Sequence, residues 1–93
     1  MSEKLSGIVA EAESDRPILE HEEPGVILRP VETWYEPIVI GKDVKLVLFN
    51  GDCYQTRAIG LELGKNAKGL IIDEIPGVAN ENLLGAKLYV LAE

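Results

Sequence analysis

Cys53 and His21 are the only cysteine and the only histidine in the 93-residue chain, which makes them its first candidates for a nucleophile and a general base. A working pair of this kind must be in contact, and the thiol needs electropositive surroundings that favour the thiolate. Cys53 instead follows Asp52, whose negative charge opposes thiolate formation. We therefore expect a structural role for Cys53, and we assign no catalytic residue.

The segment 20-EHEE-23 holds residue types that bind zinc, and Asp73-Glu74 is a neighbouring pair of carboxylates. A zinc site needs three or four converging ligands. In an extended segment, His21 and Glu23 share one face and the other two glutamates share the opposite face. Asp73 and Glu74 follow a strand-like run, where adjacent side chains point to opposite faces and do not form an acid–base pair. We expect neither a metal nor a cofactor.

The distribution of charge excludes several classes of partner. The net charge is −7, and residues 1–36 hold nine acidic residues against three basic ones. Binding to nucleic acid or to an anionic membrane requires several basic groups on one face, which this half of the chain does not supply. The chain also lacks the glycine-rich patterns that bind phosphate groups. We therefore expect no nucleic-acid partner and no membrane partner.

The cysteine count and the first residues bear on the compartment. A single cysteine cannot form an internal disulfide, which is typical of proteins in a reducing compartment. The start of the chain, MSEKLSGIVAEAES, carries acids and no long apolar run, unlike a secretory or transit peptide. No run approaches the roughly 20 apolar residues of a membrane-spanning helix. The sequence predicts a cytoplasmic protein.

Proline and glycine divide the chain into short segments rich in valine and isoleucine, which favour strands. The sequence predicts one domain, residues 1–93, that is mainly β: a small antiparallel β-barrel or sandwich of about six strands. At most one short helix is expected, near residues 78–85. Residues 1–16 are open to a second interpretation, a loosely packed N-terminal arm. The strand candidates are 6–12, 25–29, 34–40, 43–49, 53–63, 68–75 and 86–92.

Three of these candidates carry a further expectation. The first can instead form a short helix through Ala10 to Glu13. The third contains Pro37, which lacks an N–H group, so this segment is expected to be an edge strand or to carry a bulge. In the fifth, Gly60 predicts a bend or a bulge.

The fourth and fifth candidates predict a hairpin, whose register decides which side chains face the core. A two-residue turn at 50–51 is the strongest local hairpin signal, but it pairs Leu48 with Cys53 and mixes polar with apolar side chains. A three-residue loop at 50–52 pairs Leu48 with Tyr54 instead. In this register the apolar side chains lie on one face and the polar side chains on the other more cleanly. Burial of a large apolar side chain contributes about 1.5–3 kcal/mol, so the three-residue loop is favoured. Cys53 then faces away from the core.

An apolar outer surface is the main functional candidate. One ring of Trp34-Tyr35 is expected to point outward, as are Val47 and Phe49, unless the N-terminal segment covers them. Exposed apolar patches mark interfaces more often than chemistry. We therefore expect a small acidic protein-interaction module, either a homo-oligomer or the binder of a protein partner. Its expected contact residues are Trp34, Tyr35, Val47, Phe49, Cys53 and Arg57.

The alternative function is the binding of a small molecule. The mouth of a small barrel often holds one ligand in an apolar cleft with a few polar groups. The expected lining is aromatic, with one cation: Trp34, Tyr35, Tyr54, Tyr89 and Arg57.

Residues 40–64, with 69–75 and 82–90, resemble the second domain of translation GTPases, which is a small β-barrel. This resemblance covers about half of the chain and implies a barrel, but the GTP-binding domain on which that family's function depends is not present. Residues 78–85 also resemble the end of sugar-phosphotransferase IIA proteins of the glucitol type, without a phosphorylatable histidine in a matching context. Neither resemblance transfers a role to a residue.

Overall fold

The chain folds into six antiparallel strands and one short 3-10 turn, as a computed structural model shows for residues 2–15, 24–36, 38–62 and 69–92. The prediction of a mainly β domain of about six strands is therefore confirmed. The elements in chain order are β1 (Ser2–Asp15), β2 (Gly25–Pro30), β3 (Asp43–Val47), β4 (Cys53–Leu61), β5 (Leu70–Asp73), the 3-10 turn η1 (Asn80–Leu83) and β6 (Lys87–Ala92).

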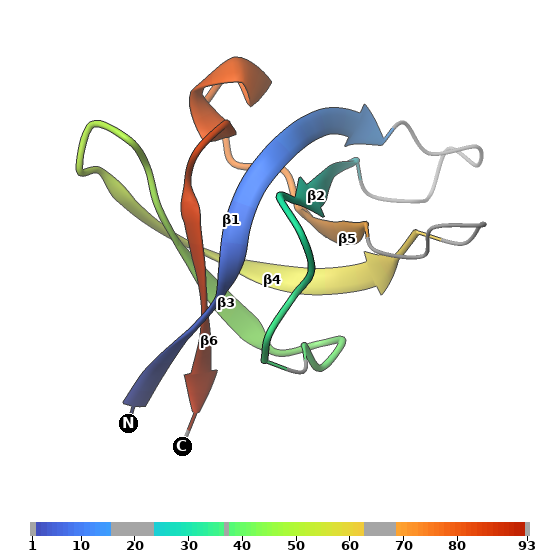
Figure 1. Ribbon diagram of the computed structural model, residues 1–93. Helices are drawn as coiled ribbons and strands as arrows, with labels where there is room; N and C mark the ends of the chain where they lie inside the picture. Colours follow the sequence, from blue (N-terminus) through green and yellow to red (C-terminus); the bar gives the residue numbers. More distant parts are fainter. Residues whose placement is uncertain (1, 16–23, 37, 63–68, 93) are drawn as a thin grey trace.

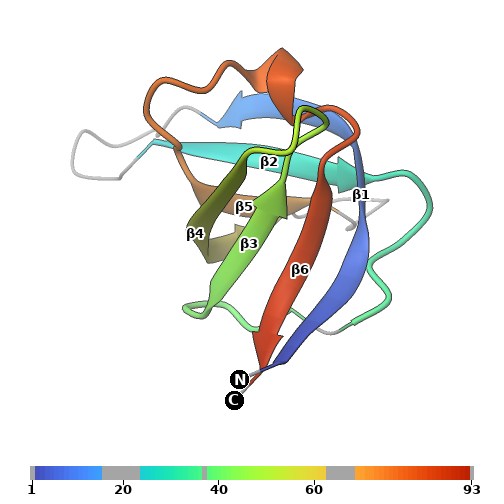
Figure 2. The same cartoon turned by 90° about the vertical axis from the view of Figure 1, so that its left-hand side faces the viewer.

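The strands form a closed barrel in the order β1-β2-β5-β4-β3-β6, and β6 pairs back to β1 (Figures 1 and 2). Each neighbouring pair is antiparallel. A closed barrel leaves no strand edge free for pairing with another chain. Contacts with a partner must therefore come from side chains and loops of the described barrel.

Two long strands bend to close the barrel. The first half of β1 pairs with β6 and its second half with β2, and the register shifts between Leu5 and Gly7 and again between Val9 and Glu11. Strand β4 pairs first with β3 and then with β5, with a register shift between Ala58 and Gly60. Bulges increase the local twist and bend a strand, which is how a small barrel turns its corners. The irregularity predicted at Gly60 is confirmed.

The core is built from side chains that alternate along the strands. In β3, Val44 and Leu46 are buried while Lys45 and Val47 are half-buried, which is the period of two expected for a strand with one apolar face. The buried hydrophobic residues form one cluster: Val9, Val26, Leu28, Val44, Leu46, Leu48, Ala58, Leu70, Ile72, Leu83, Ala86 and Leu88.

The strand predicted for 34–40 is wrong, because residues 31–36 cross over β1 instead of joining the sheet as a strand. The Val31 N–H donates to the Ile8 carbonyl (2.9 Å), and the Tyr35 N–H donates to the Ser6 carbonyl (2.6 Å). These bonds use backbone groups of β1 near its bulges. Pro37 lies outside the described residues.

The N-terminal segment belongs to the barrel. Strand β1 is paired along its length with β6 and β2, so residues 2–15 form neither the short helix nor the loosely packed arm that the sequence left open. The two ends of the described chain lie side by side, since Ser2 pairs with Ala92 (Figure 1).

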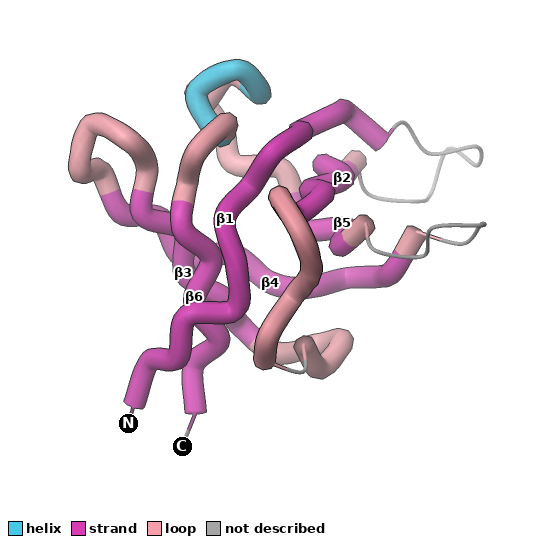
Figure 3. The backbone as a smooth tube through the Cα atoms, in the orientation of Figure 1, coloured by secondary structure: helices cyan, strands magenta, loops and turns pink. Residues whose placement is uncertain are grey.

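Among the residues that the structure describes, helical structure is limited to η1, which is coloured cyan in Figure 3. The short helix predicted near 78–85 is therefore a single 3-10 turn, and Gly85 follows it with a positive φ of 80°, a conformation that glycine adopts without steric cost. Within the described residues there is no helix with the length and apolar character needed to cross a membrane.

Candidate functional site

The β3–β4 hairpin has a three-residue loop, but its position differs by one residue from the prediction. Val47 pairs with Cys53, and the Leu48 N–H donates to the Asp52 carbonyl (2.7 Å), so the loop is 49–51 and not 50–52. A three-residue hairpin loop has a left-handed residue at its last position, and glycine adopts that conformation most easily. Gly51, with a φ of 93°, takes this position, so the loop ends at residue 51. Tyr54 pairs with Leu46 in the structure, whereas the prediction paired it with Leu48, so the strand pairing is shifted by two residues. Because this shift is even, every side chain keeps its predicted face and Cys53 points outward.

The tip of this hairpin is ordered by local bonds and exposes an aromatic ring. The Gly51 N–H donates to the Leu48 carbonyl (2.9 Å), and the Asp52 N–H donates to Oδ1 of Asn50 (3.0 Å). Leu48 is buried, whereas the neighbouring Phe49 is 93% exposed. The tip therefore presents Phe49 to solvent on a backbone that is already fixed.

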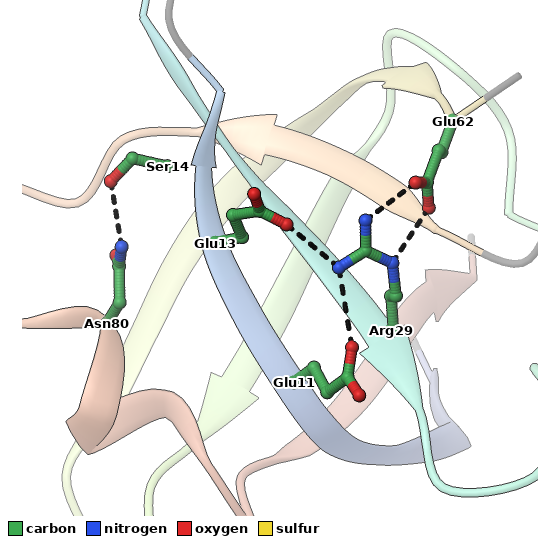
Figure 4. Close-up of polar contacts among 6 residues, drawn as sticks. All are labelled: Glu11, Glu13, Ser14, Arg29, Glu62 and Asn80. Atoms are coloured by element: carbon green, nitrogen blue, oxygen red, sulfur yellow. Dashed lines mark hydrogen bonds and ion pairs between the residues drawn. The ribbon is translucent and has the colours of Figure 1, made fainter.

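Segment 75–86, which contains η1, faces this hairpin tip at the same end of the barrel (Figures 1 and 2). Leu83 is buried in the core, and the Gly85 N–H donates to the Val9 carbonyl (2.8 Å). The Asn80 side chain donates to the hydroxyl of Ser14 in β1 (2.8 Å), as Figure 4 shows. These contacts fix segment 75–86 against the barrel.

A cleft of about 450 Å³ lies between the tip and segment 75–86, and we name it the tip groove. Its volume is within the range of clefts that bind ligands, roughly 300–1,000 Å³. Five of its described lining residues are apolar or aromatic: Leu48, Phe49, Tyr54, Val78 and Leu84. Phe49 and Leu84 are the exposed members of this set, so part of the apolar lining is in contact with water.

The remaining side chains of the tip groove are polar and acidic. Asp52 and Asn50 come from the hairpin, and Glu81 and Asn82 come from η1. The Asn50 amide donates to Oδ2 of Asp52 (3.0 Å), whereas no ion pair among the described residues involves Asp52 or Glu81. The described lining includes no lysine, arginine or histidine. The tip groove therefore combines an apolar part with amide and acidic side chains, and its described charged residues are both negative.

A second cleft, of about 340 Å³, contains the cysteine. Lys45 lines it and its ammonium donates to both carboxylate oxygens of Glu3 (3.0 and 3.3 Å), which raises the pKa of Lys45. The Cys53 thiol is exposed and donates to the Gly51 carbonyl (3.7 Å). The one described cation of this cleft is therefore already paired with a carboxylate. His21, the only histidine, lies outside the described residues.

The six predicted contact residues do not gather on one surface. Val47 and Cys53 lie opposite each other on the outer side of the hairpin, next to the loop that carries Phe49. Trp34 is half-buried against the core, and Tyr35, 63% exposed, lies beside β1 in the crossing segment.

The five residues predicted to line a small-molecule cleft are likewise dispersed. Arg57 forms an exposed ion pair with Asp73 in β5 (3.5 Å). Tyr89 lies on β6 opposite Lys45 and Leu5. Of the five residues, only Tyr54 lines either of the two clefts.

Sequence analysis missed one wall of the tip groove. Leu83 and Leu84 are adjacent in η1 and the turn that follows, and adjacent residues there cannot both reach the same core. Leu83 is buried and Leu84 is 46% exposed. This doublet is the signal in the sequence that could have indicated an apolar residue at the surface near Glu81.

Arg29 forms an ionic cluster with three glutamates from two other parts of the chain (Figure 4). Its guanidinium binds both carboxylate oxygens of Glu62 (2.6 and 3.0 Å) and donates to Glu13 (3.0 Å) and Glu11 (3.4 Å). A Cβ at Gly69 would stand 2.7 Å from that of Glu62, so a glycine is needed beside this carboxylate. The cluster joins β1, β2 and the end of β4, and we assign it a structural role.

This cluster makes a prediction about pH. The hydrogen bonds from Arg29 lower the pKa of Glu62 below its ordinary value of 4.5, so folding favours the ionised form. The resulting stability is present above the unfolded-state pKa and is lost as the pH falls through the folded-state pKa. Glu62→Gln is expected to lower the urea midpoint at about pH 7, and the deficit should shrink at about pH 3. Glu74→Gln, at an exposed residue that has no ion pair with any described residue, is the control. A deficit that is equal at both pH values would contradict this assignment.

Comparison of the sequence with protein families, curated proteins and solved structures finds no match. Function must therefore be inferred from the geometry of this chain.

Proposed function

We propose that the protein is an interaction module that binds a segment of another protein in the tip groove. The observation that carries the proposal is the 93% exposure of Phe49 beside a cleft of about 450 Å³. Burying a phenylalanine side chain is favourable by about 1.5–3 kcal/mol relative to leaving it in water. The ring of Phe49 gains little of this free energy in the isolated chain, because it is exposed. A partner that covers the ring would gain it on binding.

The shape of the tip groove favours a protein segment over a small molecule. Pockets for small molecules enclose most of the ligand surface. Here the largest apolar side chain of the lining, Phe49, stands almost entirely in solvent. Such a ring contacts a segment laid across it better than a small molecule held beneath it. Aromatic side chains are also enriched among the residues that dominate protein interfaces.

A second copy of this chain is the less favoured partner. The chain carries a net charge of −7, and the rim of the tip groove adds Asp52 and Glu81 to the contact. Two copies meeting through this surface would bring like charges together, which is unfavourable at an interface. The closed barrel also removes the free strand edge through which β-proteins often associate.

Selection from a displayed library of random peptides tests the proposal. Peptides selected on the wild-type protein are expected to lose about tenfold or more in affinity for Leu84→Ser, since interface contacts of this size are worth more than 1 kcal/mol. Ile40→Ser is the matched control, because Ile40 and Leu84 are both 46% exposed and Ile40 does not line the tip groove. Peptides that bind all three proteins equally, or a selection without enrichment, would overturn the proposal.

A further inference from the structure

We infer that the segment bound in the tip groove has an apolar side chain flanked by lysine or arginine. This inference rests on the proposed function and specifies the partner. The apolar part of the lining provides a contact for one large hydrophobic side chain: Phe49 and Leu84 are its exposed members, and Tyr54 and Val78 are half-buried, one on each wall. The requirement for flanking cations comes from the rim.

The two acids of the rim stand on opposite walls of the tip groove. Asp52 belongs to the hairpin and Glu81 to η1, so a segment crossing the apolar lining has one carboxylate on each side. Neither carboxylate has a cationic partner among the described residues. A bound segment with acidic flanks would meet two like charges, whereas basic flanks would form ion pairs with both.

Among the described residues, three carboxylates of the barrel wall are paired with cations, unlike the two of the rim. Glu3 is paired with Lys45, Asp73 with Arg57, and Glu62 with Arg29. The wall therefore has internal cations for these carboxylates, and the rim has none among the described lining residues. Opposite charges across an interface raise the rate of association and exclude partners of the wrong sign. The rim thus selects for a cationic segment.

Two matched peptides test this inference against the 93-residue chain. The first is acetyl-GKKLFKKG-amide, and the second replaces each lysine with glutamate; both carry a fluorophore for anisotropy titration. We expect the lysine peptide to bind at least about tenfold more tightly than the glutamate peptide at low salt. Asp52→Asn and Glu81→Gln should each weaken the lysine peptide about threefold, as exposed ion pairs do, and the double variant roughly tenfold. Raising NaCl to about 0.5 M should weaken binding to the wild type more than binding to the double variant.

The possible results separate this inference from the proposed function. Equal affinity for the two peptides, or a double variant that binds the lysine peptide as well as the wild type does, overturns the inference of cationic flanks. If peptide binding is nevertheless weakened by Leu84→Ser, the proposed function stands although the inference of cationic flanks does not. If neither peptide binds at about 1 mM, the weakest affinity of interest, both proposals are overturned.

Discussion

Gly7→Ala is expected to lower the free energy of unfolding by about 1–3 kcal/mol, the cost of overpacking a well-filled site. A Cβ on this residue would stand 2.8 Å from Cε3 of Trp34 and 3.1 Å from the Thr33 carbonyl oxygen. The crossing segment cannot easily move away, because the Tyr35 N–H is bonded to Ser6 of β1 (2.6 Å). The Ser6 hydroxyl, fully buried, also donates to the Glu36 carbonyl (3.0 Å).

A double-mutant cycle in urea denaturation checks this cause. Trp34→Ala alone should cost about 2–4 kcal/mol, since a half-buried ring is lost from the core surface. In the Trp34→Ala background, Gly7→Ala should cost much less, because the atom it would strike is gone. Gly60→Ala is the control, since its Cβ would come no closer than 3.5 Å to any side chain and should change stability by less than about 1 kcal/mol. Additive effects of the Gly7 and Trp34 substitutions would show that the two residues do not compete for space.

Phe49→Ser is expected to weaken binding of the lysine peptide by about thirtyfold, the effect of losing an aromatic residue that dominates an interface. The same substitution should leave the free energy of unfolding within about 0.5 kcal/mol of wild type, because the ring is 93% exposed. Loss of binding without loss of stability is the pattern of a contact residue. Anisotropy titration and urea denaturation of the same preparation measure both quantities.

Tyr35→Ser is the matched control for this prediction, since Tyr35 is also an exposed aromatic residue but lies beside β1. We expect it to bind the peptide as the wild type does. If Tyr35→Ser weakens binding and Phe49→Ser does not, the interface lies on the crossing segment and β1 instead of the tip groove.

Local patterns in the sequence were sufficient to predict most of the strands. Alternation of apolar residues in β3 and β4, with short segments bounded by glycine and proline, predicted strands whose inward faces are those observed. The hairpin register was misplaced by two residues, an even shift that leaves every side chain on the same face. The prediction of which side chains face inward was therefore correct, although the predicted residue pairs were not.

The remaining features depend on contacts between distant residues. Segment 34–40 has the composition of a strand, but Trp34 and Tyr35 lie against Gly7 and the bulged part of β1, which no local pattern reveals. The same applies to the pairing of Arg29 with Glu62, 33 residues away. The tip groove combines residues from the hairpin with others about 30 positions later, so its two walls could not be brought together from the sequence.

The most direct test of the tip groove as a binding site is a map of amide chemical shifts. The isotope-labelled protein would be titrated with the lysine peptide. We predict that the largest changes occur in two separate segments, residues 48–54 and 77–84, which line the tip groove together. Changes centred on residues 5–8 and 31–35, with 48–54 and 77–84 unaffected, would show that the peptide does not bind in the tip groove.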